Sequence, residues 1–400
     1  MCADSLRPAK AAYQPPSFTG AQTELSQLTS WSGLVADSST PEQLRRLGTM
    51  GVLASAASLS HGSLLRATAQ PSREVEAALA GALAYDKCRL GRPSARPAVP
   101  RPVQGTGADL SCLLDKMLVN LGTELAAAVN GRLSVELDAR LAYDTDALKS
   151  KARALAEMYA EMGVLIDKLL FRVPATWEGI QAVSALEQQG MKCHVTHVFS
   201  LTQAVAAAHA GCAVVQPSVG RLQAWYAAHP NARAPGARGT REDAGALAVR
   251  GDEGKGESAG RSLVAATVAY MKKHGLKSRV MAAVATMDDV RALAGTDFLV
   301  APVSVLESLA AMPTGAGHND GIVGAQATLK EMSPIQMRAA QACSLEACEL
   351  AFSGKKSDFD TAMKSGPAQE LLQKAVQRAA ESAAQAEAYM EKMWPPAGGL

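Results

Sequence analysis

The sequence has few aromatic residues and no long apolar run. Phe, Trp and Tyr make up 4% of the 400 residues, whereas hydrophobic residues in total make up 48%. A sizeable core can therefore be buried, and Ala, Leu, Val and Met must fill most of it. No stretch reaches the roughly 18 apolar residues that a membrane-spanning helix requires. The sequence thus predicts a globular chain with no membrane partner and excludes a wholly disordered one.

Neither sign of charge predominates, because 40 Lys and Arg residues stand against 38 Asp and Glu residues, for a net charge of +2. This balance argues against nucleic acid as an obligate partner. The seven cysteines form no CxxC pair, and their odd number favours a reducing compartment. The N-terminal segment lacks the apolar region of a secretory signal. We therefore expect a cytoplasmic location, with a cilium, the cytoskeleton or a plastid as alternatives.

A short strand-like run followed by an Ala-rich amphipathic stretch recurs along the chain. The candidate strands cover residues 33–36, 131–137, 168–173, 192–199, 213–217, 279–284 and 297–301, with a weaker one near 50–54. The candidate helices cover residues 144–162, 176–189, 201–210, 219–228, 262–274, 287–293 and 303–311. Strands separated by single helices predict right-handed βαβ units and a parallel sheet. About eight such units predict an α/β fold with a single (β/α)8 TIM barrel rather than a doubly wound sheet.

The pattern divides the chain into three regions. Residues 1–24 lack periodicity and predict an N-terminal extension, residues 25–312 carry the barrel, and residues 313–400 predict a helical tail over the barrel. Within the barrel region, residues 229–260 are rich in Gly, Arg, Glu and Asp and predict a long solvated loop. Insertions cost least in such segments, so the extension and this loop are the places where we expect protein partners, or filler without a partner.

The segment 131–144 carries the most informative polar pattern in the first half of the chain. Ser134, Glu136 and Asp138 alternate along a candidate strand and therefore share one face. Barrel enzymes place acids and bases at the carboxyl ends of their strands. The pattern predicts either such chemistry or a structural salt bridge at the rim with Arg140.

A second candidate is Arg172, near the end of the strand 168–173. If alternate residues of this strand point inward, the guanidinium lies inside the barrel mouth. A buried cation there needs an anionic partner. A substrate phosphate and a structural pair with Glu136 or Asp37 account for Arg172 equally well.

His194 and His197 are possible metal ligands by residue type. Because they stand three residues apart in a strand, they face opposite sides, and no third ligand has a suitable spacing. We therefore expect no metal, with His194 and Thr196 facing inward together. Further along, Gly220 and Arg221 begin a candidate helix whose N–H groups would form an anion cradle. A turn glycine followed by a surface arginine is the alternative. No P-loop, GxGxxG, GxSxG or HExxH motif is present.

Several long segments, in order, resemble the transaldolases, and most of all their plant and cyanobacterial branch. They are GRLSVELDARLAYDT (131–145), DKLLFRVPATWEGI (167–180), HVTHVFSLTQA (194–204), VGRLQAW (219–225), KSRVMAA (277–283), APVSVLESL (301–309) and GPAQELL (366–372). The resemblance covers roughly residues 24–400. It implies a class I aldolase-type (β/α)8 barrel that needs no cofactor and transfers a dihydroxyacetone unit between sugar phosphates.

The resemblance also implies an essential lysine on the fourth strand, which forms a Schiff base with the ketose, and Arg172 stands at that position. An arginine stays protonated and does not form the imine. Lys168 cannot replace the lysine, because four residues place it roughly 13 Å down the strand. The family's phosphate-binding arginine of the seventh strand is matched by Thr286. The second-strand asparagine segment of bacterial members is matched by residues 54–58, where no asparagine remains.

Other family positions are retained. By resemblance, Asp37 is the first-strand acid, Glu136 and Thr196 hold the catalytic water, and Arg221 binds the substrate phosphate, while Gln216 replaces a phosphate-contacting serine. We therefore predict a catalytically inactive transaldolase-like protein with a structural, scaffolding or binding role in a larger assembly. The alternatives are an active transaldolase of the pentose phosphate pathway, acting between sedoheptulose 7-phosphate and glyceraldehyde 3-phosphate, and a non-catalytic sugar-phosphate binder.

Overall fold

A computed structural model of the chain describes residues 23–29, 31–37, 41–49, 56–69, 71–88, 109–230, 232, 259–313, 333–343, 354–364 and 366–393. Residues 1–22 of the extension expected at 1–24, most of the loop at 229–260 and the weak strand candidate near residues 50–54 lie outside the described residues. The three-region division of the chain therefore stays a prediction.

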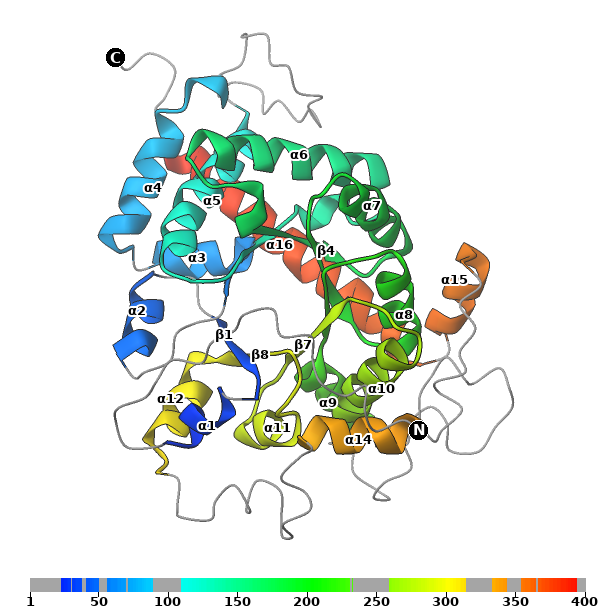
Figure 1. Cartoon of the computed structure of the whole chain (residues 1–400). Helices are drawn as coiled ribbons and strands as arrows, with labels where there is room; N and C mark the ends of the chain where they lie inside the picture. Colours follow the sequence, from blue (N-terminus) through cyan, green and yellow to red (C-terminus); the bar gives the residue numbers. More distant parts are fainter. Residues whose placement is uncertain are drawn as a thin grey trace.

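Eight parallel strands form a nearly closed barrel with helices between them (Figure 1). The order around the sheet is β1-β8-β7-β6-β5-β4-β3-β2, and β1 and β2 stand at its two ends. The strands are β1 Gly33–Asp37, β2 Ala57–Leu59, β3 Leu133–Glu136, β4 Leu169–Pro174, β5 Cys193–Val198, β6 Val214–Pro217, β7 Arg279–Ala283 and β8 Phe298–Pro302. The predicted TIM barrel is confirmed.

The helices surround the strands as an outer layer. They are α1 Glu24–Leu28, α2 Pro41–Thr49, α3 His61–Ala69, α4 Arg73–Leu83, α5 Leu110–Ala127, α6 Thr145–Glu161, α7 Trp177–Gln188, α8 Leu201–His209, α9 Val219–Ala228, α10 Ala259–Lys273, α11 Met287–Ala292, α12 Val303–Ala311, α14 Pro334–Cys343, α15 Lys356–Lys364 and α16 Ala368–Met393, with short 3-10 turns η1 Asp86–Cys88, η2 Ala139–Leu141 and η3 Ile166–Lys168. Side-chain caps fix several helix starts. Thr176, for example, accepts a hydrogen bond from the backbone N–H of Gly179 at 2.9 Å.

Inward-facing side chains fill the barrel in layers, as the alternation along each strand requires. One layer is apolar and joins five strands or their approaches through Val35, Ala56, Leu170, Val214 and Met281, all buried. Two residues further along β4 stands Arg172, and along β6 stands Gln216. The apolar layer therefore forms the floor beneath a polar layer at the carboxyl ends of the strands.

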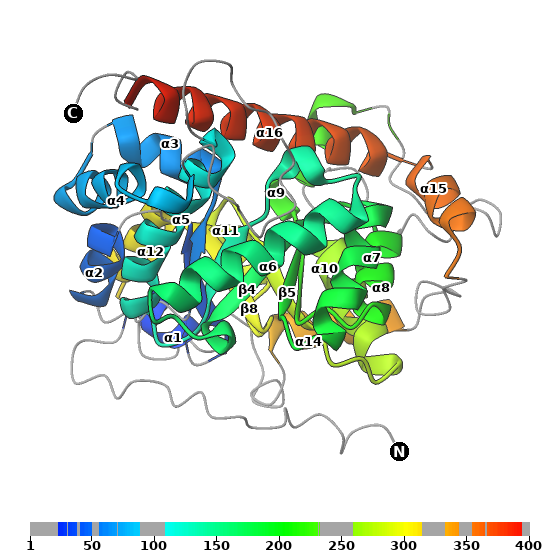
Figure 2. The same cartoon turned by 90° about the horizontal axis from the view of Figure 1, so that it is seen from above.

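The long C-terminal helix α16 lies across one end of the barrel (Figure 2). Its contacts place it over the carboxyl ends of the strands, because Glu387 of α16 binds Arg140, which follows β3. The preceding α15 packs through Phe359 against Trp177, with ring centroids 5.5 Å apart. The helical tail thus roofs the mouth.

Two cysteines depart from the expectation of a reducing compartment. Cys88 and Cys112 form a disulfide, with Cα atoms 5.4 Å apart, between η1 and the start of α5. Neither their spacing nor the odd number of cysteines indicated this pair. Cys193 and Cys212 are free and buried. Among the described residues, no helix is both long and apolar enough to span a membrane.

Candidate functional site at the barrel mouth

Three neighbouring strands bring ionisable side chains to one level of the barrel. Glu136 of β3 pairs in register with Arg172 of β4, which pairs with His194 of β5. Side chains at paired positions of parallel strands lie side by side, so these three share a layer. Glu136 and His194 are buried and Arg172 is half-buried. The carboxyl ends of β3–β5 therefore hold a cluster of a carboxylate, a guanidinium and an imidazole.

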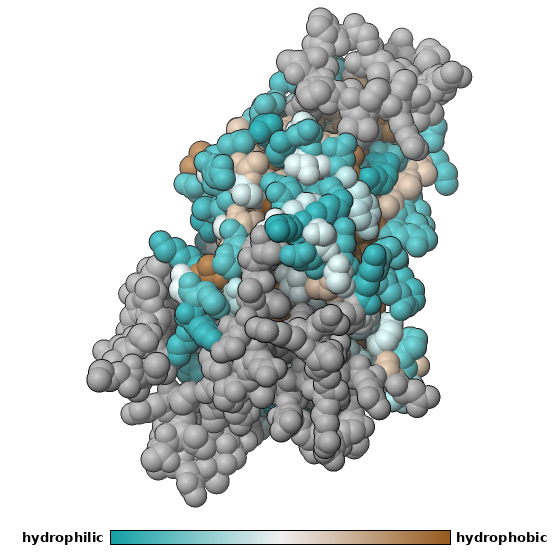
Figure 3. All heavy atoms as spheres, turned by 90° about the vertical axis from the view of Figure 1, so that its right-hand side faces the viewer, coloured by the Kyte–Doolittle hydropathy of each residue, from teal (hydrophilic) through white to brown (hydrophobic). Residues whose placement is uncertain are grey.

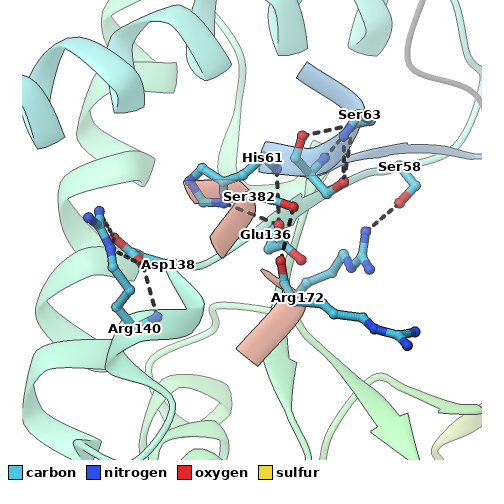
Figure 4. Close-up of polar contacts among 10 residues, drawn as sticks. Ser58, His61, Ser63, Glu136, Asp138, Arg140, Arg172 and Ser382 are labelled. Carbon is cyan, nitrogen blue, oxygen red and sulfur yellow. Dashed lines mark hydrogen bonds and ion pairs between the residues drawn. The ribbon is translucent and has the colours of Figure 1, made fainter. Parts of the chain in front are cut away.

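Arg172 lies between Glu136 and His194 and makes few hydrogen bonds to the described residues. Its Nη1 donates a hydrogen bond to Oγ of Ser58 on β2 at 2.8 Å, as Figure 4 shows. Its buried Nε has no hydrogen-bond partner, and none of the described carboxylates lies within 4.0 Å of its guanidinium. The direct pair with Glu136, one of the alternatives for Arg172, is therefore not formed. The backbone of Asp37 ends β1 opposite Pro302, but the side chain of Asp37 lies outside the described part of the chain.

Glu136 is bound instead by His61, the first residue of α3 (Figure 4). The backbone N–H of His61 lies 3.0 Å and its Nδ1 3.1 Å from Oε2 of Glu136. Burial by itself raises the pKa of Glu136, but the hydrogen bonds from His61 and the charge of Arg172 outweigh burial and lower this pKa to about 2. Glu136 is therefore a fixed carboxylate at neutral pH. A group with so low a pKa is a poor acid and a poor base there.

The rim beside Glu136 carries the ion pair that the sequence left as an alternative. Nε of Arg140 donates to both carboxylate oxygens of Asp138, at 2.9 and 3.0 Å. The two terminal nitrogens of Arg140 reach Glu387 of α16 at 2.6 and 2.5 Å. Asp138 thus holds Arg140 in place to bind α16. Of the two alternatives for Asp138, chemistry or a salt bridge with Arg140, the structure shows the salt bridge.

His194 faces inward, as predicted, and lies against β3. Its Nδ1 is 2.8 Å from Oγ of Ser134, while its buried Nε2 makes no hydrogen bond of normal geometry, although Gln216 lies near enough to favour the protonated ring. Burial and then the charge of Arg172 lower the pKa of His194 to about 3. The imidazole is therefore neutral at physiological pH.

His197 corrects the expectation that it faces away from His194. The β5–β6 ladder shifts register between Val195 and Val198, and His197 has φ 58°, in the left-handed region. This bulge breaks the strand alternation on which the expectation rested. His197 is buried within electrostatic range of Arg221, Arg172 and Glu136, and burial first, then the two cations, lower its pKa to about 3. Both histidines therefore belong to the mouth, and both are neutral.

The other predicted site residues lie on two sides of the mouth. Thr196 is buried on β5, where its backbone oxygen accepts from the N–H of Ala175 at 2.8 Å. Arg221 is exposed in the first turn of α9. Thr286 caps α11, because its Oγ1 accepts from the N–H of Asp289 at 3.1 Å and donates to Oδ2 of Asp289 at 2.9 Å. The hydroxyl of Thr286 is thus engaged in a helix cap.

Sequence reasoning missed three residues that complete this site, namely Ser58, His61 and Glu387. Each comes from a segment distant in sequence from its partner, by 114, 75 and 247 residues. None carries a motif, and only the paired strands and the roofing helix bring them together. No group of three or more His, Cys, Asp or Glu residues suited to a metal ion occurs in the described ranges.

The arrangement offers one fixed cation at its centre, one fixed anion beside it and two neutral imidazoles. Such a set can bind and orient an anionic or polyhydroxylated ligand through charge and hydrogen bonds.

Comparison with known proteins gives a consistent result. A model of the family "Transaldolase/Fructose-6-phosphate aldolase" matches residues 74–388. The transaldolase of Chlamydia muridarum is 34% identical over 291 residues, which cover 72% of this chain and 76% of that protein. The transaldolase of Yersinia pseudotuberculosis is 38% identical over 199 residues, 49% of this chain and 56% of that protein. The family model spans the strands β3–β8 and most of α16, and β1, β2 and α3 precede the matched residues.

Proposed function

This chain belongs to the transaldolase and fructose-6-phosphate aldolase family, and from that premise we propose that it is a member without Schiff-base chemistry. On this proposal the barrel is retained for a binding or scaffolding role in a larger assembly. The observation that carries the proposal is Arg172, an inward guanidinium at the centre of the mouth. A guanidinium is no nucleophile toward a ketose carbonyl at neutral pH.

Two lysines near the barrel, Lys168 and Lys151, cannot supply the amine that Schiff-base formation requires. Lys168 precedes β4, and its Nζ lies 3.2 Å from the backbone oxygen of Asn130, at the opposite end of the barrel from the mouth. Lys151 of α6 is bound to Asp115 of α5 at 2.8 Å, and the charge of Asp115 helps to raise its pKa against the effect of burial. Neither amine is available to form an imine in the mouth.

The state of Glu136 supports the same proposal. A transfer through a Schiff base needs proton transfers, which are most efficient with a group whose pKa lies near the working pH. Glu136 has a pKa of about 2 and accepts two hydrogen bonds from His61. Recovery of activity would therefore require more than one change in this mouth.

Borohydride trapping tests the loss of Schiff-base chemistry. The purified full chain is incubated with fructose 6-phosphate and sodium borohydride, and its intact mass is measured. We expect no adduct and no transaldolase turnover. An adduct of sugar mass on the unmodified protein would overturn the proposal and establish the chain as an active transaldolase.

The variant Arg172→Lys measures how far the rest of the mouth has changed. It shortens the cation and breaks the hydrogen bond to Ser58. Because Glu136 stays locked by His61, we expect at most weak adduct formation and no turnover. Arg172→Met, which removes the charge, is the matched control and should form no adduct.

A second candidate, sugar-phosphate binding without turnover, is favoured by two cations at one mouth. Arg172 and Arg221 both lie close enough to His197 to lower its pKa. Guanidinium groups suit phosphate oxygens. Calorimetry with sedoheptulose 7-phosphate distinguishes this function from a purely structural one, for which no heat of binding is expected.

The assembly role has its own test. The described residues of the face shown in Figure 3 are mainly hydrophilic, so we expect a partner on that face to be held by polar contacts. The native protein, purified under low and high salt, should migrate in a large complex that salt dissociates. Migration as a lone chain at both salt concentrations would contradict the assembly role and leave the loss of chemistry as a separate question.

A further inference from the structure

A corner of the molecule far from the mouth holds a cation with weak partners. It is built by Tyr85 and Lys87 after α4, by Lys116 of α5, and by Glu161 and Met162 at the end of α6. Lys116 is 5% exposed. Its Nζ lies 3.1 Å from the sulfur of Met162 and 4.7 Å from the centroid of the Tyr85 ring. Thioether sulfur and an aromatic face are weak partners for an ammonium group.

The carboxylate of Glu161 is bound by groups other than Lys116. Oε2 of Glu161 accepts from the hydroxyl of Tyr85 at 2.6 Å, and its Oε1 accepts from Nζ of Lys87 at 2.8 Å. None of the described carboxylates lies within 4.0 Å of the Lys116 ammonium. Burial therefore lowers the pKa of Lys116, opposed by the charge of Glu161 and reinforced by Lys87. The ammonium form lacks a strong acceptor.

Met162, in contrast, is open to reagents. It caps α6 and is 40% exposed, beside Leu165 at 72% and Ile166 at 41%. Oxidation of a thioether to a sulfoxide replaces a weak acceptor with an oxygen that accepts strongly. In Met162 that oxygen would form within reach of the Lys116 ammonium.

We propose that Met162 is a site of reversible oxidation by peroxides, with the ammonium group of Lys116 binding the sulfoxide oxygen. A sulfur lone pair attacks one oxygen of hydrogen peroxide, the O–O bond breaks, and the sulfur loses two electrons. The departing hydroxide takes a proton from the Lys116 ammonium, and the hydroxyl group now on the positively charged sulfur gives its proton to the resulting amine, which restores the ammonium. Thioether and peroxide thus give sulfoxide and water. The new oxygen then accepts a charge-assisted hydrogen bond and links α5 to α6.

An independent feature places oxidation chemistry in the same corner. The Cys88–Cys112 disulfide joins η1 to α5, and Cys112 stands one helical turn before Lys116. The disulfide and the sulfoxide are both two-electron oxidation products. The segment 162–166 is apolar and holds three of the exposed large hydrophobic residues. A sulfoxide at Met162 would add a polar group to this surface.

The experiment treats the full chain with limiting hydrogen peroxide and follows the oxygen mass gain at each methionine by peptide mapping. Met393, which is 43% exposed at the end of α16, is the matched control. We expect Met162 to be oxidised several-fold faster than Met393, and methionine sulfoxide reductase to return its mass to the starting value. Equal rates for the two methionines would overturn the proposal.

Variants of Lys116 separate the effect of the ammonium from the effect of exposure. Lys116→Leu should bring the rate at Met162 down to that of Met393, while Lys116→Arg, which keeps a charged donor, should retain the difference. An unchanged rate in Lys116→Leu would contradict the role of the ammonium. If Lys116→Leu does not fold, as judged by circular dichroism, the wild-type ratio and Lys116→Arg decide, because a loss of the difference in Lys116→Arg would also count against the proposal.

Discussion

The two sides of the barrel mouth hold buried charge in opposite ways. On the side of β2–β5, the guanidinium of Arg172 makes one hydrogen bond to the described residues, and its buried Nε has no partner among them. On the side of β6–β8, Asp289 accepts from Gln223 at 3.0 Å, from Arg261 at 2.8 Å and from Thr286 at 2.9 Å. A buried polar group with unmet hydrogen bonds costs stability, whereas a fully bonded one contributes to it.

The difference in hydrogen bonding between the two sides indicates which of them is the candidate for ligand binding. Natural proteins accept incompletely satisfied groups mainly at sites that bind or react. The β2–β5 side, with Arg172 and His194, has that character, and the Asp289 network on the other side is structural. Variants of the Asp289 network should therefore change stability, whereas variants of Arg172 should change ligand binding.

Asp289→Ala should give the largest effect. It removes a carboxylate that is 1% exposed and leaves Arg261 without its ion pair. Breaking a buried pair by removing one partner costs about 3 kcal/mol or more. Urea unfolding measures this loss of free energy. Asp288→Ala, which removes a largely exposed carboxylate paired with Arg291, is the matched control. A similar loss of unfolding free energy in both variants would contradict the difference between the two sides.

Glu136 should make stability depend on pH in the acidic range. Its pKa in the folded state is about 2, lowered from the ordinary value of 4.5, so it stabilises the fold above pH 4.5. This contribution, about 3 kcal/mol at about 1.4 kcal/mol per pKa unit, is lost as pH falls from 4.5 through 2. Unfolding free energies at pH 7, 4.5 and 3 check the slope. In Glu136→Gln the slope between pH 4.5 and 3 should become shallower, and an unchanged slope would contradict the lowered pKa.

Thr286→Ala should cost about 1 kcal/mol, the usual loss of a side-chain cap at a helix start. The hydroxyl leaves both the N–H of Asp289 and its carboxylate with one partner fewer. Thr286→Ser keeps the hydroxyl and should stay near the wild-type stability in urea unfolding. If Thr286→Ala instead abolished ligand binding without loss of stability, Thr286 would belong to the functional side.

Arg140→Lys should give the smallest effect on global stability, below about 1 kcal/mol, since both Arg140 and Glu387 are partly exposed to solvent. A lysine cannot hold two carboxylates with a planar fork. We expect the end of α16 to open more often, which limited proteolysis detects as faster cleavage within α16. Arg153→Lys, on the outer face of α6, should leave the cleavage rate unchanged.

The barrel was predictable because each βαβ unit carries its own local signal. The helices α9 and α12 begin and end where the pattern placed them. No helix was predicted for residues 61–127, where α3, α4 and α5 lie, and α5 shows the reason. Of its 18 residues 13 are buried, so its apolar residues do not form a single face that a periodicity would reveal. The strand β2 has only three residues, too few for an alternating pattern.

The site was predictable in its strand residues and not in their partners. Ser134, Glu136 and Arg172 face the mouth because strand alternation requires it. The ring of His197 entered the mouth through a bulge, which the alternation rule could not foresee. His61 reaches Glu136 only after the chain has closed into a barrel, and no local rule connects positions 75 residues apart.

The bond between Arg140 and Glu387 also orders events during synthesis. Because 247 residues separate the two, the ribosome releases Asp138 and Arg140 long before their helical partner exists. At a usual rate of about 5–20 residues per second, that interval lasts on the order of 10 to 50 seconds. Throughout it the carboxyl ends of the strands already made lack the helix α16 that covers them in the finished protein.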